Sequence, residues 1–232
     1  MLESSTGTKC SGGEALEFLL PFARIFQPRS VLARVDFKGG FAYATDKRIA
    51  VRVQTYTIQE NPSEDYPFEK LDEIVSKVDS TDSWFKIDKD KFEGLTKIFL
   101  EKVASEAEEN AYENSGRYVS VDCPHCGEPV FFDLEKNILV EEMERAPFDL
   151  KIVPFYGRLK MGEKHVNIGF GYLYTACRSF DEEGLMFSVV KGQDNIDWLA
   201  MKTANGLAKA ILMPLTVEDD FEPEWSIECM GV

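Results

Sequence analysis

Apolar residues follow two periods along this chain, and the periods divide it into helices and strands. Helical spacing predicts helices over residues 14–26, 68–78, 89–104 and 169–180. Alternation of apolar and polar residues predicts short strands over residues 31–37, 41–45, 48–53, 84–87, 118–121, 129–132, 138–140, 165–168, 185–190, 198–201 and 208–213. Gly39-Gly40 and Asn205-Gly206 are typical of hairpin turns between such strands.

A helix followed by three antiparallel strands recurs three times, starting near residues 13, 84 and 165. This recurrence predicts an α+β fold with helices on one face of a large antiparallel sheet. We expect a flexible tail over residues 1–12, repeated units over 13–83, 84–145 and 146–218, and an acidic tail over 219–232. The first unit ends in an acidic connector, and the second contains a Cys-Pro-His-Cys hairpin.

Residues 39–51, Gly-Gly-Phe-Ala-Tyr-Ala-Thr-Asp-Lys-Arg-Ile-Ala-Val, resemble a strand–turn–strand segment of bacterial sliding clamps, the beta subunit of DNA polymerase III. That family carries Ala-Thr-Asp-Gly-His-Arg-Leu-Ala-Val. The positions that match in identity or kind are Ala44, Thr45, Asp46, Arg48, Ile49, Ala50 and Val51. Lys47 stands where the family has Gly-His, so the turn is one residue shorter here.

Residues 166–180, the three strands after them and residues 210–215 are similar to the last half-domain of the same clamps. The family ends in Met-Pro-Met-Arg-Leu, and Met213, Pro214 and Leu215 match it in kind. Thr216 replaces the basic residue, and about 16 residues follow it. The two matches cover about 70 of 232 residues. The chain is too short for a three-domain clamp subunit and has room for three half-units or for one clamp domain with an insertion. The resemblance therefore implies a short variant of the phage or mobile-element type.

The resemblance implies a DNA-clamp-like fold and a non-enzymatic accessory role in DNA replication or repair. It implies DNA polymerase or other replication and repair proteins as partners, and it leaves double-stranded DNA and a second copy of the chain open as further ones. The alternative is a clamp-derived protein-interaction module that does not encircle DNA. In the family, partner peptides enter an apolar cleft, and by resemblance Ile49, Met213, Pro214 and Leu215 line it. The competing interpretation of these four residues is a buried edge strand that ends at a proline.

Encircling DNA requires helices with basic residues that reach the phosphates. The candidates on the predicted helices are Arg24, Lys89, Lys91, Lys97, Lys102 and Arg178. Glu93 and Glu101 interrupt the lysines of the third helix, so an ordinary solvated helix remains the competing interpretation.

Composition narrows these hypotheses. The chain has 26 Lys and Arg against 41 Asp and Glu, a net charge of −15, which opposes nucleic-acid binding by the whole surface but leaves a local basic face open. Apolar residues at 44% exclude bulk disorder. We expect no membrane span and no secretory signal. The odd, sparse set of five cysteines predicts a protein of the reducing cytoplasm.

Cys123-Pro-His-Cys-Gly127 has the form of a zinc knuckle, with Cys123 and Cys126 as the two thiolate ligands. A structural zinc needs further ligands, from Cys10, Cys177, Cys229 or a second chain. A thioredoxin-type redox site and a reduced hairpin turn that is the relic of a zinc site are the alternatives. We expect no other cofactor. The sequence lacks the motifs of nucleotide-binding loops, nucleophile elbows and zinc proteases, and its acidic clusters at 106–109 and 141–144 are typical of solvated faces, so we expect no enzyme.

Overall fold

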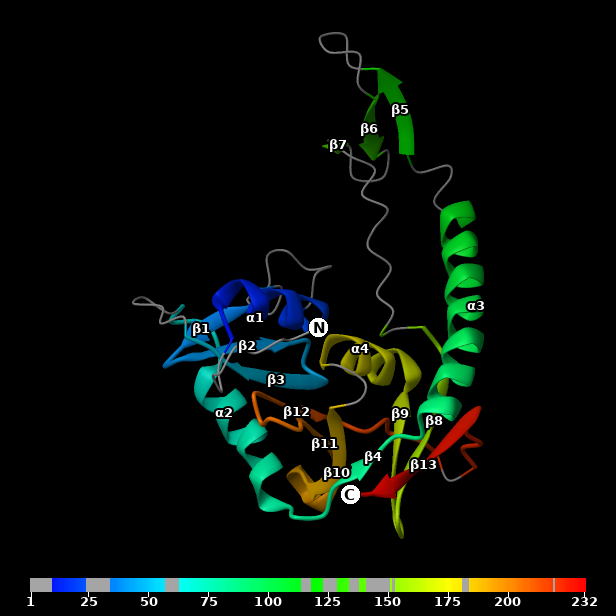
Figure 1. The fold of residues 1–232 in the computed structure, drawn as a ribbon. Coiled ribbons are helices and arrows are strands. Elements are labelled where there is room, and N and C mark those ends of the chain that lie inside the picture. Colours follow the sequence, from blue (N-terminus) through cyan, green and yellow to red (C-terminus); the bar gives the residue numbers. More distant parts are fainter. Residues whose placement is uncertain are drawn as a thin grey trace.

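The computed structural model describes residues 10–23, 34–56, 63–113, 118–122, 129–133, 138–140, 151, 153–180, 184–218 and 220–232 (Figure 1). Its helices are α1 (Gly12–Leu19), α2 (Phe68–Ser76), α3 (Lys89–Glu113) and α4 (Phe170–Phe180). Short 3-10 helices cover Leu20–Phe22, Lys77–Ser80 and Gln193–Asn195. Among these described helices, none combines the length and the apolar composition that crossing a membrane requires.

The strands form one sheet of ten and a separate sheet of three. The large sheet has the order β1-β2-β3-β12-β11-β10-β4-β13-β8-β9, and the small one has the order β5-β6-β7. The strands are β1 (Asp36–Lys38), β2 (Phe41–Thr45), β3 (Ile49–Gln54), β4 (Phe85–Lys86), β5 (Tyr118–Asp122), β6 (Pro129–Asp133), β7 (Ile138–Val140), β8 (Tyr156–Met161), β9 (Lys164–Gly169), β10 (Leu185–Lys191), β11 (Asp197–Thr203), β12 (Ala208–Leu212) and β13 (Trp225–Gly231). Neighbouring strands are antiparallel except β13 and β8, which are parallel. The α+β class predicted from the sequence is confirmed.

Two helix-plus-meander units meet in the middle of the fold. The first consists of α1 and β1–β3, and the second of α4 and β10–β12. Their last strands pair antiparallel, with Ile49 opposite Leu212 and Val53 opposite Ala208. The two helices lie side by side on one face of the sheet (Figure 1), where the Phe22 and Phe180 rings stack with centroids 5.2 Å apart.

We call the sheet face toward α1, α3 and α4 the inner face, and the opposite one the outer face. The inner face carries the main core, in which Phe92, Phe99, Phe170 and Phe187 are almost fully buried. The sequence predicts all helices on one face, and this is wrong for α2. Figure 1 shows α2 on the other side of β3 and β12 from α1 and α4, and its Phe68 packs there against Tyr43 of β2.

The ends of the helices depart from the sequence prediction for local reasons. Ser11 caps α1, since its hydroxyl accepts from the Glu14 N–H at 3.3 Å while the Glu14 carboxylate accepts from the Ser11 N–H at 2.6 Å. Pro21 then lies in a single 3-10 turn after which Ala23 is extended, and residues 24–26 of the predicted helix lie outside the described residues. Cys10, which was expected in the flexible tail, forms a bridge with Thr55. In contrast, α3 runs nine residues beyond the predicted end at 104, to residue 113.

Two strands of the large sheet are absent from the sequence prediction. Residues 156–161, expected in a connector, form β8, and residues 225–231, expected in an acidic tail, form β13 between β4 and β8. Trp225 anchors β13 because its ring packs on Phe170 and its indole N–H donates to the Phe155 carbonyl at 3.2 Å. The ring lies so close to Gly157 that a side-chain carbon there would stand 2.1 Å from it.

Candidate functional site

The clamp-like motif at residues 44–51 forms the turn between β2 and β3. The Asp46 carboxylate accepts from the Arg48 and Ile49 N–H groups at 2.9 and 3.0 Å. Thr45 accepts from the Lys47 N–H at 3.1 Å and donates to the Ile49 carbonyl at 2.7 Å. Lys47 takes a left-handed conformation, with φ of 81°. The Thr-Asp-Lys-Arg pattern is therefore explained by the hydrogen bonds of a tight turn.

Behind this turn lies a buried ion pair between Lys151 and Asp46. The Lys151 ammonium lies 3.4 Å from the second Asp46 oxygen, and both side chains are more than nine-tenths buried. The ammonium also donates to the Pro21 carbonyl at 2.8 Å, and the Tyr172 hydroxyl donates to Asp46 at 2.9 Å. These contacts join the β2–β3 turn, the end of α1 and α4. Because the charges are paired and hydrogen-bonded, the cluster has the character of a structural clasp.

The four predicted cleft residues lie close along the backbone but do not line one groove. Ile49 is 1% exposed and faces the inner core. Met213 follows β12 on the outer side, where it packs beside Ile74 and Ile211. Its N–H donates to the Arg48 carbonyl at 2.9 Å, and the Leu215 N–H donates to the Asn167 carbonyl of β9 at 2.9 Å. The predicted cleft is therefore corrected: Ile49 is a core residue, and Met213, Pro214 and Leu215 form a half-buried segment across the end of the sheet.

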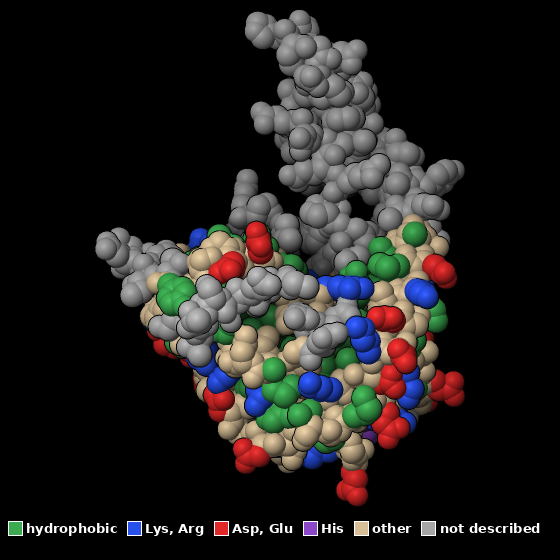
Figure 2. All heavy atoms as spheres, viewed as in Figure 1, with side chains coloured by type: hydrophobic (Ala, Val, Ile, Leu, Met, Phe, Trp, Pro, Cys, Tyr) green, Lys and Arg blue, Asp and Glu red, His purple; other side chains and the backbone are tan. Residues whose placement is uncertain are grey.

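Four of the predicted DNA-facing residues lie on α3. Lys89, Lys91 and Lys97 are exposed on α3, and Lys91 lies 4.0 Å from an Asp88 oxygen. Lys102 pairs with Glu224 at 2.5 Å and lies over the Phe155 ring. On the face shown in Figure 2, Lys and Arg side chains are interspersed with Asp and Glu, without one continuous basic stripe.

One of the remaining two candidates lies on α4. Arg178 is exposed on α4 and stacks over the Tyr174 ring. Arg24 lies outside the described residues. The five candidates that the structure describes thus lie on two helices, where Lys102 pairs with Glu224 and Arg178 stacks over a tyrosine ring.

The proposed zinc ligands Cys123 and Cys126 also lie outside the described residues. The three other cysteines, Cys10, Cys177 and Cys229, are buried in the inner core. Burial raises the pKa of the Cys229 thiol to about 12, so this group is a neutral core side chain at physiological pH. Within the described ranges, no group of three or more His, Cys, Asp or Glu residues has the arrangement to hold a metal ion.

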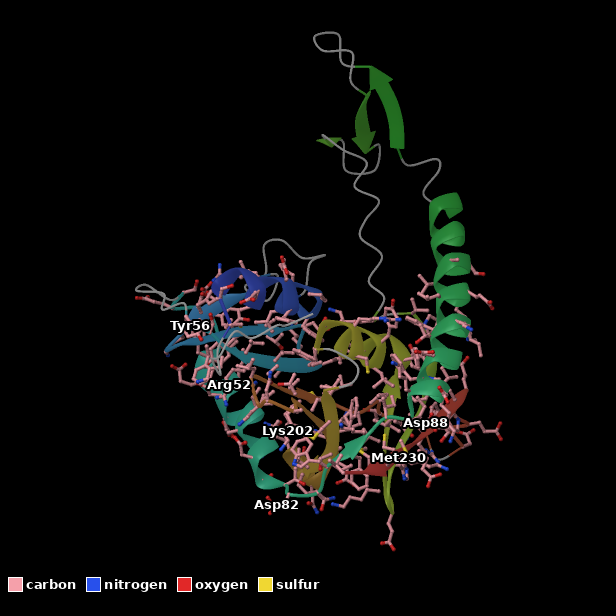
Figure 3. All side chains as sticks on the ribbon, viewed as in Figure 1. Arg52, Tyr56, Asp82, Asp88, Lys202 and Met230 are labelled. Atoms are coloured by element: carbon pink, nitrogen blue, oxygen red, sulfur yellow. The ribbon has the colours of Figure 1, made fainter. Side chains whose placement is uncertain are left out.

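One surface that the sequence prediction missed lies on the outer face of β4, β13, β8 and β9. The other half of the outer face is covered by α2 and the 3-10 turn after it, which pack on β3 and β10–β12. On β8, β9 and β13, apolar inner positions alternate with exposed or half-exposed polar ones. Figure 3 labels Met230 on this bare half and Arg52 on the covered half, well apart. The signal was present, since residues 158–161 and 225–229 alternate between polar and apolar character.

Comparisons of the chain with protein-family models, curated proteins and solved structures found no match. The function is therefore argued from the residues and their arrangement.

Proposed function

We propose that this chain is a non-enzymatic accessory protein of DNA replication or repair, built on a clamp-like domain that docks partner proteins. The observation that carries the proposal is the joining of two helix-plus-meander units through β3 and β12, with α1 and α4 side by side over the joint. The two sequence segments that resemble sliding clamps lie in these units: residues 39–51 cover β2 and the start of β3, and residues 166–180 cover most of β9 and α4.

Charge favours a module that does not encircle DNA. Helices that face DNA need exposed cations, because phosphate contacts supply most of the affinity. The exposed side chains of α1 include Glu14 and Glu17, and α1 carries no basic residue. Lys102 of α3 forms an ion pair with Glu224. Docking of a partner protein by the half-buried segment 213–215 remains available to such a module, because flexible Met side chains suit adaptable contacts.

Solution mass, measured by light scattering with and without nicked circular DNA, tests the proposal. An interaction module keeps the 26.3 kDa mass of the single chain and elutes apart from the circles at physiological salt. A ring-forming clamp has a multiple of that mass, stays on the circles and is released when they are linearised. Association with the circles that linearisation releases would overturn the non-encircling form of the proposal. Catalytic turnover of a substrate by the chain, lost when residues that the structure describes are substituted, would overturn the non-enzymatic role.

A further inference from the structure

The bare half of the outer face concentrates basic side chains in a strongly acidic protein. We call the set Lys86 of β4, Arg158 and Lys160 of β8 and His165 of β9 the basic face. The strand registers place them on one surface, because Lys86 is opposite Met230, Arg158 is beside Ser226, and Lys160 is beside both Glu228 and His165. Their neighbours along the strands, Ile87, Leu159, Met161 and Val166, are buried in the inner core.

The spacing of these side chains follows from the geometry of the sheet. Arg158 and Lys160 are two residues apart on one strand, which separates them by about 7 Å. Lys86 lies two strands away from β8, about 10 Å across the sheet. Such a flat grid of cations matches an extended chain of negative charges better than a single small anion.

Among the described residues, no ion pair neutralises the charges of the basic face. Elsewhere in the described residues, basic side chains commonly pair with carboxylates: Arg52 with Asp72 at 2.7 Å and Lys209 with Asp79 at 2.6 Å. In contrast, the part of the chain that the structure describes brings no carboxylate within 4.0 Å of the four basic side chains, and Arg158 is held by the Asn167 side-chain carbonyl at 2.9 Å. Glu228 is the acidic side chain that β13 adds to this face.

Two uncharged exposed side chains complete the surface. Tyr156, two residues before Arg158 on β8, is 36% exposed, and Met230 on β13 is 60% exposed. An aromatic ring beside cations on an open antiparallel sheet is the arrangement on which unpaired bases stack while the cations hold the phosphates. Lysine is depleted from the centres of protein–protein interfaces, so two lysines on the basic face favour a nucleic acid over an acidic polypeptide.

We propose that the basic face binds single-stranded nucleic acid, with Lys86, Arg158 and Lys160 on the phosphates and Tyr156 as a stacking surface for a base. Because the net charge of the chain is −15, a polyanion is repelled by most of the surface and is oriented toward this face. The site is independent of the clamp-like interpretation, since it lies on the face opposite α1 and α4.

Fluorescence anisotropy of the full chain with a labelled oligo(dT) of about 15 nucleotides tests the proposal. Three phosphate contacts predict a logarithmic salt dependence with a slope of about −2 for a single strand. The variant Lys86→Gln with Lys160→Gln is expected to weaken binding about tenfold and to reduce the slope by about 1.4. Tyr156→Ala is expected to weaken binding at least about fivefold.

The chain offers a matched control in Lys97→Gln with Lys164→Gln. Both lysines are exposed, and the control removes the same charge, but Lys97 lies on α3 and Lys164 shares the strand parity of the buried Val166. The control is expected to bind like the natural chain. Glu228→Gln removes the acid that lies beside Lys160 and is expected to strengthen binding about twofold, a gain that a folding defect cannot imitate.

Three results would overturn the proposal. One is no binding at about 50 mM salt, where phosphate contacts are strongest. Another is an equal loss in the control variant, which would mean that net charge alone sets the affinity. The third is equally effective competition by polyglutamate, which would make the surface a site for acidic polypeptides. If the double variant melts at a lower temperature than the natural chain, Glu228→Gln decides the outcome, and the absence of a gain in affinity would overturn the proposal.

Discussion

The two halves of the ten-stranded sheet share one inner core but differ in what lies on their outer face. Over β3 and β12, the outer face is covered by α2 and the turn after it, through Phe68, Leu71 and Val75 and through the ion pairs of Arg52 with Asp72 and of Lys209 with Asp79. Over β8, β9 and β13, the outer positions are polar and remain open to solvent. A strand buried on both faces contributes apolar packing twice, while a strand with one bare face depends on a single layer and leaves its other side available for binding.

The largest expected effect is the loss of the anchor of the bare half. Trp225→Ala removes a 4%-exposed ring that packs on Phe155 and Phe170 from the only apolar face of β13. The unfolding free energy is expected to fall by about 4 kcal/mol, measured by urea denaturation. Phe68→Ala, in the covered half, is the comparison. Hydrogen exchange of this variant is expected to show a loss of protection mainly in α2. A cost below about 1 kcal/mol for Trp225→Ala would show that the bare half does not depend on one layer.

Next in size is the clasp behind the β2–β3 turn, which secures the covered half to α4. Lys151→Met leaves Asp46 buried without its cation and is expected to cost about 3 kcal/mol in a thermal or urea melt. Combining it with Asp46→Asn should cost less than the sum of the two single changes, because the pair acts as a unit. Lys164→Met is the exposed control and should leave stability within about 0.5 kcal/mol.

An alkaline titration probes the inner side of β13. Burial holds the pKa of Cys229 near 12 in the folded chain, above its ordinary value of 9.0. The folded state thus retains a proton that the unfolded state releases. The contribution of the protonated Cys229 thiol to the free energy of unfolding is therefore complete below pH 9 and is lost as the pH rises from 9 toward 12. At pH 10 the expected loss is about 1 kcal/mol. In a series of urea melts at increasing pH, the unfolding free energy of Cys229→Ala should fall less steeply than that of the natural chain. An equally steep fall would contradict the assignment of this pH dependence to Cys229.

The smallest effect concerns an ion pair that helps to hold α2 and the turn after it, which cover half of the outer face. Asp79, in the turn after α2, accepts from Lys209 of β12 at 2.6 and 2.8 Å, but its side chain is 60% exposed. Asp79→Asn is expected to cost less than about 1 kcal/mol, with the difference from the natural chain disappearing at high salt. A larger and salt-insensitive loss of unfolding free energy would mean that charge, rather than apolar packing, attaches α2 and its following turn to the sheet.

The local elements were predictable where the pattern is strong and short-range. Strand β2, helix α4 and the Gly39-Gly40 turn appear where alternation, helical spacing and paired glycines predict them, and both glycines have positive φ angles. Strands β8 and β13 were missed because proline, glycine and acidic residues around them weigh toward loops. Their period-two alternation was visible, yet a polar–apolar stretch of four or five residues is convincing only when a partner strand is known.

The candidate surfaces show the same limit of prediction from sequence, because they too depend on which strands become neighbours. The resemblance brought Ile49 and Met213 together as cleft residues, and the pairing of β3 with β12 does make them neighbours along the backbone. Their side chains nevertheless point to opposite faces, because Ile49 is opposite Leu212 and the next residue turns the other way. The basic face was out of reach of the sequence for a different reason: its members come from residues 86, 158–160 and 165, and only the insertion of β13 between β4 and β8 makes them neighbours.

By itself, the sequence determined the α+β class and the hairpin turns, because these depend on residues close together in the chain. Only the tertiary structure decided which face each helix covers, where the last strand enters the sheet and which charges share a surface. Those outcomes depend on pairings between residues more than 60 positions apart, such as Trp225 with Gly157, whose cost in chain entropy is offset only by the assembled core.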